Sequence, residues 1–398
     1  MPIERGYGEV QNHGMPGNEL ITEVAERARE EGVLGIDTEF MSEGRYRPLL
    51  CLIQLAVRNS GDARVELIDP FDQPAVEPLA EVLADPGVEI VMHAARQDVA
   101  ILRRALGTEV RGLFDTQLAA GFAGLSASLG YGALLDQLLG VKLKKGEGFT
   151  KWDRRPLTPQ QVRYARDDVA HLIQLADAIK ERLTENGRLE WVREECRPLE
   201  AASDEREAHE VWRRLPRVNQ LGGDARAVAR EVAAWREQVA QREDKPPSTI
   251  VADQAVVAIA RSSPRSVDKL RDIRGLYPKA IKRWGDQIVA AVRRGEKAEP
   301  PAKESGGGFS TAADAPVIAL CEALVRARAL EAGLAYELIA SRADLTRVVV
   351  AARLGRPEPE VRTLQGWRRE LVGEELDGLL RGDLSLAVGE GRRLRVTG

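Results

Sequence analysis

The sequence is organised around residues 33–40, Val33-Leu34-Gly35-Ile36-Asp37-Thr38-Glu39-Phe40, an apolar run that ends in two acidic residues. The run predicts a buried strand, and residues i and i+2 of a strand point to the same face. Asp37 and Glu39 are therefore expected side by side. Two carboxylates this close repel each other unless a cation lies between them. The pair thus indicates either a divalent-metal site or two solvated acids at a strand end.

Composition sets wide bounds on the rest of the chain. With 398 residues and 43% hydrophobic content, the chain is long enough for two or three domains with sizeable cores. Its three widely spaced cysteines exclude a disulfide framework and cysteine-based metal sites, so we expect them reduced and packed. No apolar run reaches the length of a membrane span, and residues 1–10 lack the core of a signal peptide. We expect a cytoplasmic protein without a membrane partner.

The first 200 residues mix strand-like and helix-like segments. Strands are expected at 33–40, 49–57, 65–68, 89–93 and 113–115, and helices near 19–31, 76–84 and 98–106. The first three strands follow one another closely, which indicates an antiparallel meander. Later strands alternate with helices. This mixed order predicts an α/β domain over residues 1–200, with a mixed sheet flanked by helices.

A basic loop with interleaved aromatic residues spans residues 141–157, and it includes Lys145, Trp152 and Arg155. Such a mixture suits a surface that follows a single-stranded nucleic-acid backbone and stacks its bases. It fits a solvated charge run equally well, and composition leaves both interpretations open.

A second chemical signal follows this loop. Thr158-Pro159-Gln160-Gln161 predicts the N-terminus of a long helix, with a hydroxyl cap, a proline in the first turn and a glutamine at the third position. On that helix Tyr164 and Asp168 are four residues apart, so they share one face.

These residues belong to four short motifs, Asp37-Thr-Glu39, His93-Ala-Ala-Arg-Gln-Asp98, Phe114-Asp-Thr-Gln117 and Tyr164-Ala-Arg-Asp-Asp168. In this order they resemble the motif series of ribonuclease D, in the tyrosine-containing branch of the DEDD exonuclease superfamily. The resemblance implies a ribonuclease H-like sheet and two divalent cations, Mg²⁺ or Mn²⁺. It also implies 3′-5′ hydrolysis of RNA ends with release of 5′-monophosphates, and it favours precursors of transfer RNA and other stable RNAs as substrates.

The chemistry requires hard oxygen ligands from several elements around two cations. We expect Asp37 to bridge both cations. Glu39 and Asp168 would complete the shell of the cation that binds the attacking water, and Asp98 would hold the second cation through water. Tyr164 would orient the attacking water. Taken singly, Asp98 also fits a helix cap and Tyr164 a half-buried core residue.

Other residues near these motifs are candidates for contacts with the RNA. Phe40 and Met41 suit a wedge against the last bases, and Gln54, in an apolar strand, requires a hydrogen-bond partner. His93 fits either a satisfied core histidine or a contact to the terminal nucleotide. Asp115 is expected to cap or brace the fold rather than to bind metal.

Residues 205–298 predict a helical bundle that resembles the HRDC domain, an auxiliary nucleic-acid-binding module. Residues 261–298 hold 11 Lys and Arg against 4 Asp and Glu, a net charge of +7 in a chain whose total is -4. Such a cationic segment suits phosphate binding, with Lys279, Lys282 and Arg283 as the candidates. A merely solvated helix face is the alternative.

Residues 299–314 predict a flexible linker. Residues 315–398 predict a further helical domain that loosely resembles a second HRDC bundle, with helices at 337–351 and 360–371. The expected fold is therefore a ribonuclease H-like α/β domain followed by two all-α HRDC-like bundles. No Walker motif is present, so we expect no nucleotide cofactor, and a monomer is favoured.

Two other functions remain open at this level. A DNA-directed 3′-5′ exonuclease would use the same acids, because recognition of the 2′-hydroxyl lies in contacts that the sequence does not show. A non-catalytic RNA-binding protein is the second alternative, and the presence of four acids and the tyrosine argues against it.

Overall fold

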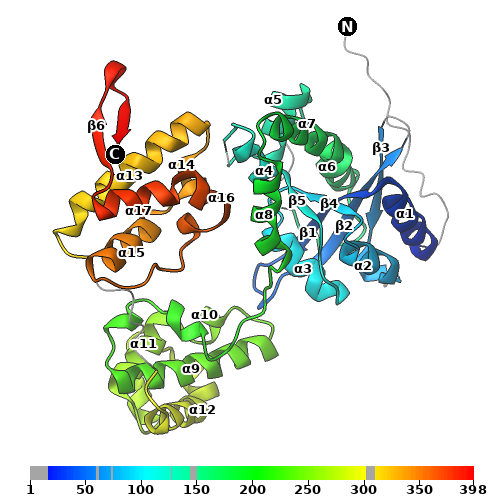
Figure 1. The fold of residues 1–398 in the computed structure, drawn as a ribbon. Helices are drawn as coiled ribbons and strands as arrows, with labels where there is room; N and C mark the ends of the chain where they lie inside the picture. Colours follow the sequence, from blue (N-terminus) through cyan, green and yellow to red (C-terminus); the bar gives the residue numbers. More distant parts are fainter. Residues whose placement is uncertain (1–16, 60–61, 73–74, 127, 144–149, 302–309) are drawn as a thin grey trace. The chain divides into compact units, whose positions relative to one another are not determined.

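The structure is a computed structural model, and it describes residues 17–59, 62–72, 75–126, 128–143, 150–301 and 310–398. The chain forms two compact units (Figure 1). The first comprises Met1–Phe40, Leu50–Ser203 and Gly308–Gly398, and the second comprises Met41–Leu49 and Asp204–Gly307.

A five-stranded sheet with the order β3-β2-β1-β4-β5 forms the centre of the first unit. Its strands are β1 (Val33–Met41), β2 (Leu49–Asn59), β3 (Asp62–Ile68), β4 (Glu89–Met92) and β5 (Leu113–Asp115). β1 pairs with β4, and β4 with β5, in parallel, whereas β2 and β3 are antiparallel. The predicted mixed sheet is confirmed, and β1, which carries Asp37 and Glu39, is its central strand.

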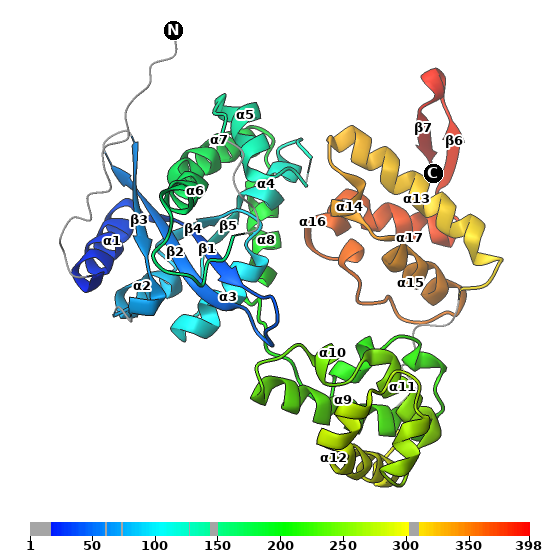
Figure 2. The same ribbon diagram turned by 180° about the vertical axis from the view of Figure 1, so that it is seen from behind.

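Helices flank this sheet on both faces. They are α1 (Gly17–Glu31), α2 (Glu77–Ala84), α3 (Arg96–Leu106), α4 (Thr116–Phe122), α5 (Tyr131–Leu139), α6 (Pro159–Ala170), α7 (Leu172–Glu185) and α8 (Leu189–Glu200). Figures 1 and 2 show α2 and α3 on one side of the sheet and α6 and α7 on the other. A Cβ at Gly35 would lie 3.2 Å from Ala56 and 3.3 Å from Ile173 of α7. Gly35 thus lets α7 pack closely on the face of β1 toward which Asp37 also points.

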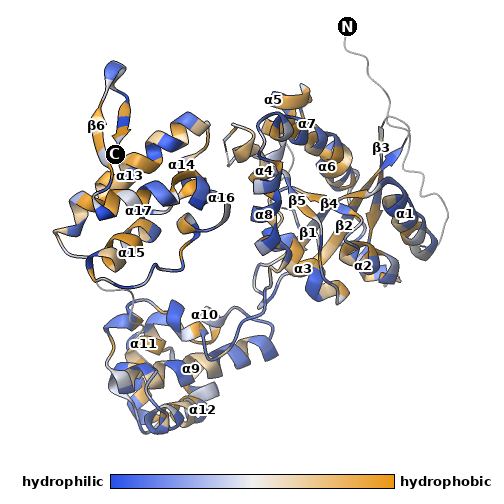
Figure 3. Cartoon of the chain, viewed as in Figure 1, coloured by the Kyte–Doolittle hydropathy of each residue, from blue (hydrophilic) through white to orange (hydrophobic). Residues whose placement is uncertain are grey.

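Apolar burial fixes the position of β1. Hydrophobic residues concentrate on the central strands (Figure 3). Leu34, Ile36 and Ile90 are 0% exposed, and each such side chain contributes about 1.5–3 kcal/mol of burial free energy. Because this packing holds β1 firmly, the backbone that carries Asp37 and Glu39 is rigid.

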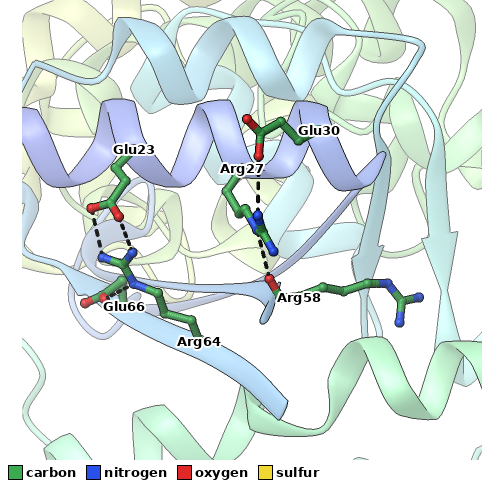
Figure 4. Close-up of polar contacts among 6 residues, drawn as sticks. All are labelled: Glu23, Arg27, Glu30, Arg58, Arg64 and Glu66. Atoms are coloured by element: carbon green, nitrogen blue, oxygen red, sulfur yellow. Dashed lines mark hydrogen bonds and ion pairs between the residues drawn. The ribbon is translucent and has the colours of Figure 1, made fainter. Parts of the chain in front are cut away.

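Polar contacts fasten α1 to the edge strand β3 (Figure 4). Arg64 donates from Nη2 to Glu23 Oε2 at 3.0 Å and from Nε to Glu66 Oε1 at 2.8 Å. Nearby, Arg27 of α1 donates from Nε to the carbonyl oxygen of Arg58 at 3.2 Å. Because these contacts are partly exposed, they contribute little to the free energy of folding. Their main effect is to fix the position of α1.

The second unit is a helical bundle of α9 (Gly223–Arg242), α10 (Pro247–Ile250), α11 (Asp253–Ser262) and α12 (Pro278–Lys297). The segment Met41–Leu49, which begins at the last residue of β1, also belongs to this unit. Tyr46 donates its hydroxyl hydrogen to Glu237 at 2.9 Å, and Arg45 pairs with Asp244 at 2.8 Å. This attachment was not predicted from the sequence.

The C-terminal part of the first unit is helical, with α13 (Asp314–Ala332), α14 (Tyr336–Ile339), α15 (Arg342–Arg353), α16 (Gly366–Arg368) and α17 (Glu374–Arg381). The single helix expected over 337–351 is wrong. The chain breaks at Ala340, and the Ser341 hydroxyl caps α15 by accepting from the Asp344 amide at 3.0 Å. The helix expected over 360–371 is also wrong, because Gly366, at φ +51°, interrupts it.

An antiparallel hairpin of β6 (Ser385–Val388) and β7 (Leu394–Thr397) closes this region, so it is not all-α as expected. Its helices share the core of the first unit. The Trp367 ring stacks on Trp191 of α8 at 4.8 Å, and Arg368 pairs with Glu195.

Two expectations about the whole chain can be compared with the described residues. Cys51, Cys196 and Cys321 are buried, as expected, and no disulfide joins these three described residues. No described helix has the length and apolar content needed to cross a membrane.

Candidate active site

Four carboxylates from three elements form one electrostatic cluster. Asp37 and Glu39 lie on β1, Asp98 in the first turn of α3, and Asp168 on α6. Burial raises the pKa of Asp37 well above its ordinary value, and the charges of Asp98, Asp168 and Glu39 raise it further. The structure thus brings together the four acids that the sequence selected, although they are up to 131 positions apart.

Burial also raises the pKa values of the other three acids. Burial, followed by the charges of Asp168 and Asp98, raises the pKa of Glu39 to about 8. Burial raises the pKa of Asp168 to about 7, although the Tyr164 hydroxyl opposes this rise. Burial raises the pKa of Asp98 to about 6, against a hydrogen bond from Thr38. The metal-free cluster therefore retains protons near neutral pH, and a divalent cation would relieve its repulsion.

The donor set fits Mg²⁺ or Mn²⁺, because both prefer hard oxygen ligands such as carboxylates. Among the described residues, no three acidic, histidine or cysteine side chains are already arranged to hold an ion. Binding of a cation would release the protons that these carboxyl groups retain.

Thr38 fixes Asp98 in place. Thr38 is 5% exposed and Asp98 8% exposed, and the Thr38 hydroxyl donates to Asp98 Oδ1 at 2.5 Å. The N-cap of α3 is Ala95, so Asp98 does not serve as the helix cap. Thr38 was not singled out from the sequence, because nothing in the motif shows which hydroxyl reaches an acid 60 positions away.

Tyr164 and Asp168 share one face of α6, as predicted. The helix begins with the predicted capping box, in which Thr158 Oγ1 accepts from the Gln161 amide at 3.2 Å and Gln161 Oε1 accepts from the Thr158 amide at 2.9 Å. Burial and the charges of Asp168, Glu39 and Asp37 raise the pKa of Tyr164. Its phenol therefore stays protonated beside the acids.

The basic loop contributes internal contacts. Trp152 is 5% exposed, and its ring lies 6.1 Å from that of Tyr164, so it supports this tyrosine and offers no free face for stacking. Arg155 donates to Asp69 at 2.8 Å and to the carbonyl oxygen of Cys51 at 2.6 Å. Lys145 lies outside the described residues.

Asp115 braces the fold, as expected. Its carboxylate accepts from the amides of Ala94 at 3.1 Å and Ala95 at 2.8 Å, and it also caps α4. Ala94 has φ +59°, a conformation that is unfavourable for a residue with a side chain. Asp115 therefore holds the turn that leads from β4 into the helix carrying Asp98.

Several buried polar atoms of the nuclease domain lack a hydrogen-bond partner among the described residues. Both amide atoms of Gln54 lack one, and Gln54 is 0% exposed. Gln54 is two residues from Ala56, which lies against Gly35, so it shares the sheet face of Asp37. The Nε2 atom of His93 also lacks a partner.

Two residues at the end of β1 were candidates for RNA contacts. Phe40 is partly buried and packs against the core of the first unit. Met41 is partly exposed and is the first residue of the segment that belongs to the second unit.

A pocket of about 590 Å³ lies in the second unit, along α10 and the start of α12. Its walls include Lys245, Lys279 and Arg283 together with Tyr277 and Trp284, and none of its lining residues is acidic. Tyr277 is 73% exposed. Two of the three basic candidates thus line this pocket, whereas the third, Lys282, does not.

Comparisons with known proteins agree with this architecture. A family model described as a 3′-5′ exonuclease matches residues 13–184, and a model described as an HRDC domain matches residues 225–292.

Curated relatives match almost end to end. Ribonuclease D of Granulibacter bethesdensis is 35% identical, over 92% of this chain and 92% of the relative. Ribonuclease D of Nitrobacter hamburgensis is 36% identical, over 95% of this chain and 99% of the relative. Among solved structures, Escherichia coli RNase D has a TM-score of 0.81 at 27% identity, over 92% of this chain and 97% of that chain.

Proposed function

This chain belongs to the ribonuclease D family of 3′-5′ exoribonucleases, and we propose that it hydrolyses RNA from the 3′ end with two divalent cations held by its four clustered carboxylates. Each turnover would release one nucleoside 5′-monophosphate. The observation that carries this proposal is the convergence of four carboxylates from β1, α3 and α6, since a cluster of acids is best neutralised by cations.

The cation-holding roles are assigned from the chemistry that hydrolysis with two cations requires. Asp37, in the centre of the cluster, would contact both cations. Glu39 and Asp168 would bind one of them, and Asp98, fixed by Thr38, would bind the other. When bound, the two Mg²⁺ or Mn²⁺ ions would supply a water with a lowered pKa and would neutralise the leaving oxygen.

The remaining steps belong to side chains of the nuclease domain. Tyr164, a protonated phenol beside Asp168 and Glu39, would orient the attacking water by a hydrogen bond. Phe40, Met41 and His93 would contact the terminal nucleotides. Gln54, which shares the sheet face of Asp37, would position the Asp37 carboxylate.

The substrate class is proposed from the family. E. coli RNase D is an exoribonuclease involved in structured RNA processing. We assign the same class to this chain, with 3′-extended transfer RNA precursors and other stable RNAs as the expected substrates.

The helical bundle of the second unit would hold the RNA upstream of its 3′ end. The pocket beside α12 combines cationic side chains with the exposed ring of Tyr277, which suits a nucleotide with its phosphate. Lys279 and Arg283 would contact RNA at this pocket, and Lys282 outside it. Lys145, Trp152 and Arg155 remain weaker candidates, because the latter two have internal contacts.

We propose domain boundaries at residues 1–200 for the nuclease, 205–298 for the HRDC domain, 299–314 for a linker and 315–398 for a C-terminal helical domain. The match of the HRDC family model to residues 225–292 supports the second of these. The contacts of Trp367 and Arg368 with α8 support a bracing role for the C-terminal domain.

Digestion of matched RNA and DNA single strands tests this function. Each strand carries a 5′ label, and products are resolved with Mg²⁺, with Mn²⁺ and with a chelator. We expect a 3′-5′ ladder and 5′-monophosphates from RNA with either metal, and none with the chelator. Faster digestion of the DNA strand would instead support the DNA-directed alternative. Binding without any cleavage would support a non-catalytic RNA-binding protein.

A further inference from the structure

The guanidinium group of Arg155 uses all of its hydrogen-bond donors within the protein. Its Nη1 atom donates to the carbonyl oxygens of Trp152 at 2.8 Å and Arg154 at 2.9 Å. Its Nη2 atom donates to the carbonyl oxygen of Cys51 at 2.6 Å and to Asp69 Oδ1 at 2.8 Å, and its Nε atom donates to Asp69 Oδ2. These five contacts match the five N–H groups of an arginine. Arg155 therefore keeps no donor for an RNA phosphate.

These contacts fasten the turn 152–155 to the sheet. Cys51 lies on β2, and Asp69 directly follows the last residue of β3. The guanidinium also lies over the Phe71 ring, with Cζ 4.7 Å from the ring centroid. The Arg155 and Asp69 side chains are only 26% and 23% exposed, so water competes weakly for this two-point contact. The position of the turn is thus set by two strands of the sheet.

Trp152, the first residue of this turn, is buried although it belongs to neither hydrophobic core of the described residues. Its ring lies beside the ring of Tyr164 on α6, with centroids 6.1 Å apart and planes inclined by 41°. This separation is within the range of favourable aromatic pairs. Tyr164 is only partly buried, so without this contact its side chain could turn to another rotamer. The Trp152 ring therefore limits the orientations open to the Tyr164 hydroxyl.

We propose that Trp152 and Arg155 are positioning residues for the attacking water, because they act through Tyr164. Arg155 fixes the turn to β2 and β3, and the Trp152 ring then holds the Tyr164 phenol in its orientation beside the acids. The inference rests on the proposed function, in which Tyr164 orients the water. It gives the aromatic and basic side chains of this turn a role inside the protein instead of on the RNA.

Trp152→Leu tests the ring contact in a double-mutant cycle with Tyr164→Phe. Leucine keeps an apolar side chain but removes the aromatic ring. On a short 5′-labelled RNA with Mn²⁺, we expect Trp152→Leu to lower kcat about 10- to 100-fold with little change in KM, as for a small displacement of a catalytic group. In the Tyr164→Phe background the same change should cost less than about threefold, because the hydroxyl that it misplaces is already absent. Trp152→Phe keeps a ring and should retain most of the activity.

Arg155→Lys distinguishes this role from an RNA contact. Lysine keeps the positive charge, so a phosphate contact would largely survive, but it loses the planar fork that the five contacts require. We expect kcat to fall about tenfold in the wild-type background and to change little in the Tyr164→Phe background. Glu23→Gln is the matched control, because it weakens the partly exposed ion pair with Arg64 in the same unit, which holds α1 to β3. It should leave kcat unchanged.

The Tm of every variant is measured, and rates are compared at a temperature where all variants are folded. Equal fold losses of kcat in the wild-type and Tyr164→Phe backgrounds would assign the turn to general stability and overturn the inference. A rise in KM with kcat unchanged would return Trp152 and Arg155 to RNA binding and also overturn it. Both outcomes would leave the proposed function intact. A wild-type rate in Tyr164→Phe itself would overturn both the orienting role of Tyr164 and this inference.

Discussion

Thr38 and Asp98 are joined by a buried hydrogen bond of 2.5 Å that links the central strand to the first turn of α3. The donor lies between Asp37 and Glu39 in the sequence, so a single tripeptide supplies two acids and the group that holds a third. The position of the Asp98 side chain thus depends on β1, the strand that also carries Asp37 and Glu39.

Thr38→Val should lower nuclease activity about 10- to 100-fold. Valine keeps the shape of threonine but removes the donor to a carboxylate, a bond of about 1.5–3 kcal/mol. The rate on short RNA at several Mn²⁺ concentrations measures the effect. Thr346→Val is the matched control, because its hydroxyl donates to the carbonyl oxygen of Arg342 in α15, at 2.8 Å. Equal losses in both variants would contradict a role for Thr38 at the site.

Tyr164→Phe should reduce turnover by roughly 10²-fold, as expected when a group that orients the attacking water is lost. RNA affinity should change little, because the ring and its contact with Trp152 remain. Single-turnover rates and equilibrium binding separate the two effects. A loss confined to affinity would contradict the orienting role.

Metal-free protein should lose stability as the pH rises from about 4 to about 8. The folded-state pKa values of Glu39 and Asp168, about 8 and about 7, lie above the ordinary carboxyl range. In this window the folded protein binds more protons than the unfolded chain, so raising the pH favours unfolding. Wild type and Asp168→Asn are compared by thermal unfolding in chelator.

Asp168→Asn removes one of the repelling acids. It should raise the Tm relative to wild type near the upper end of this window and change it little near the lower end. A Tm difference that does not depend on pH would contradict the raised pKa values.

Charge reversal at Lys279 should weaken binding of structured RNA more than reversal at Lys282. Both side chains are exposed on α12, but only Lys279 lines the pocket. Each phosphate contact adds about -0.7 to -0.9 to the slope of log K against log salt, so Lys279→Glu should also flatten this slope. Binding is measured in an Asp168→Asn background. A salt slope for Lys279→Glu equal to that of the wild-type lysine would contradict a role of the pocket in RNA binding.

Deletion of the second unit is harder to interpret than these point variants, because it removes several features at once. Ending the chain near Arg206 would remove Glu237 and Asp244, which hold Tyr46 and Arg45 in the segment that follows β1, and it would also remove the C-terminal helices of the first unit, which pack on α8. A truncated protein would therefore lose both the RNA pocket and the anchor of this segment.

The parts of the fold that follow from local patterns were predictable from the sequence. Apolar runs identified β1 and β2, and Thr158 with Gln161 identified the start of α6 because a capping box is a local interaction. The four acids were found because each lies in a motif with fixed spacing.

Features that depend on distant partners were not predictable in this way. The bond from Thr38 to Asp98 and the contact of Tyr131 with His93 join different elements. The segment Met41–Leu49 is polar, and only its partners on the bundle show that it belongs to the second unit. The C-terminal breaks at Ser341 and Gly366 were missed because apolar periodicity continues across them.

The most direct test of the account measures release of the 3′-terminal nucleotide from a 3′-extended transfer RNA by metal-stripped protein. Mg²⁺ or Mn²⁺ is then added back to wild type, Asp37→Asn, Glu39→Gln, Asp98→Asn and Asp168→Asn, each with its fold checked by circular dichroism. We expect 5′-monophosphate release only by wild type and only with metal, because losing one carboxylate leaves a cation under-neutralised. Metal-independent release, or more than about a tenth of the wild-type rate in Asp168→Asn at saturating metal, would contradict it.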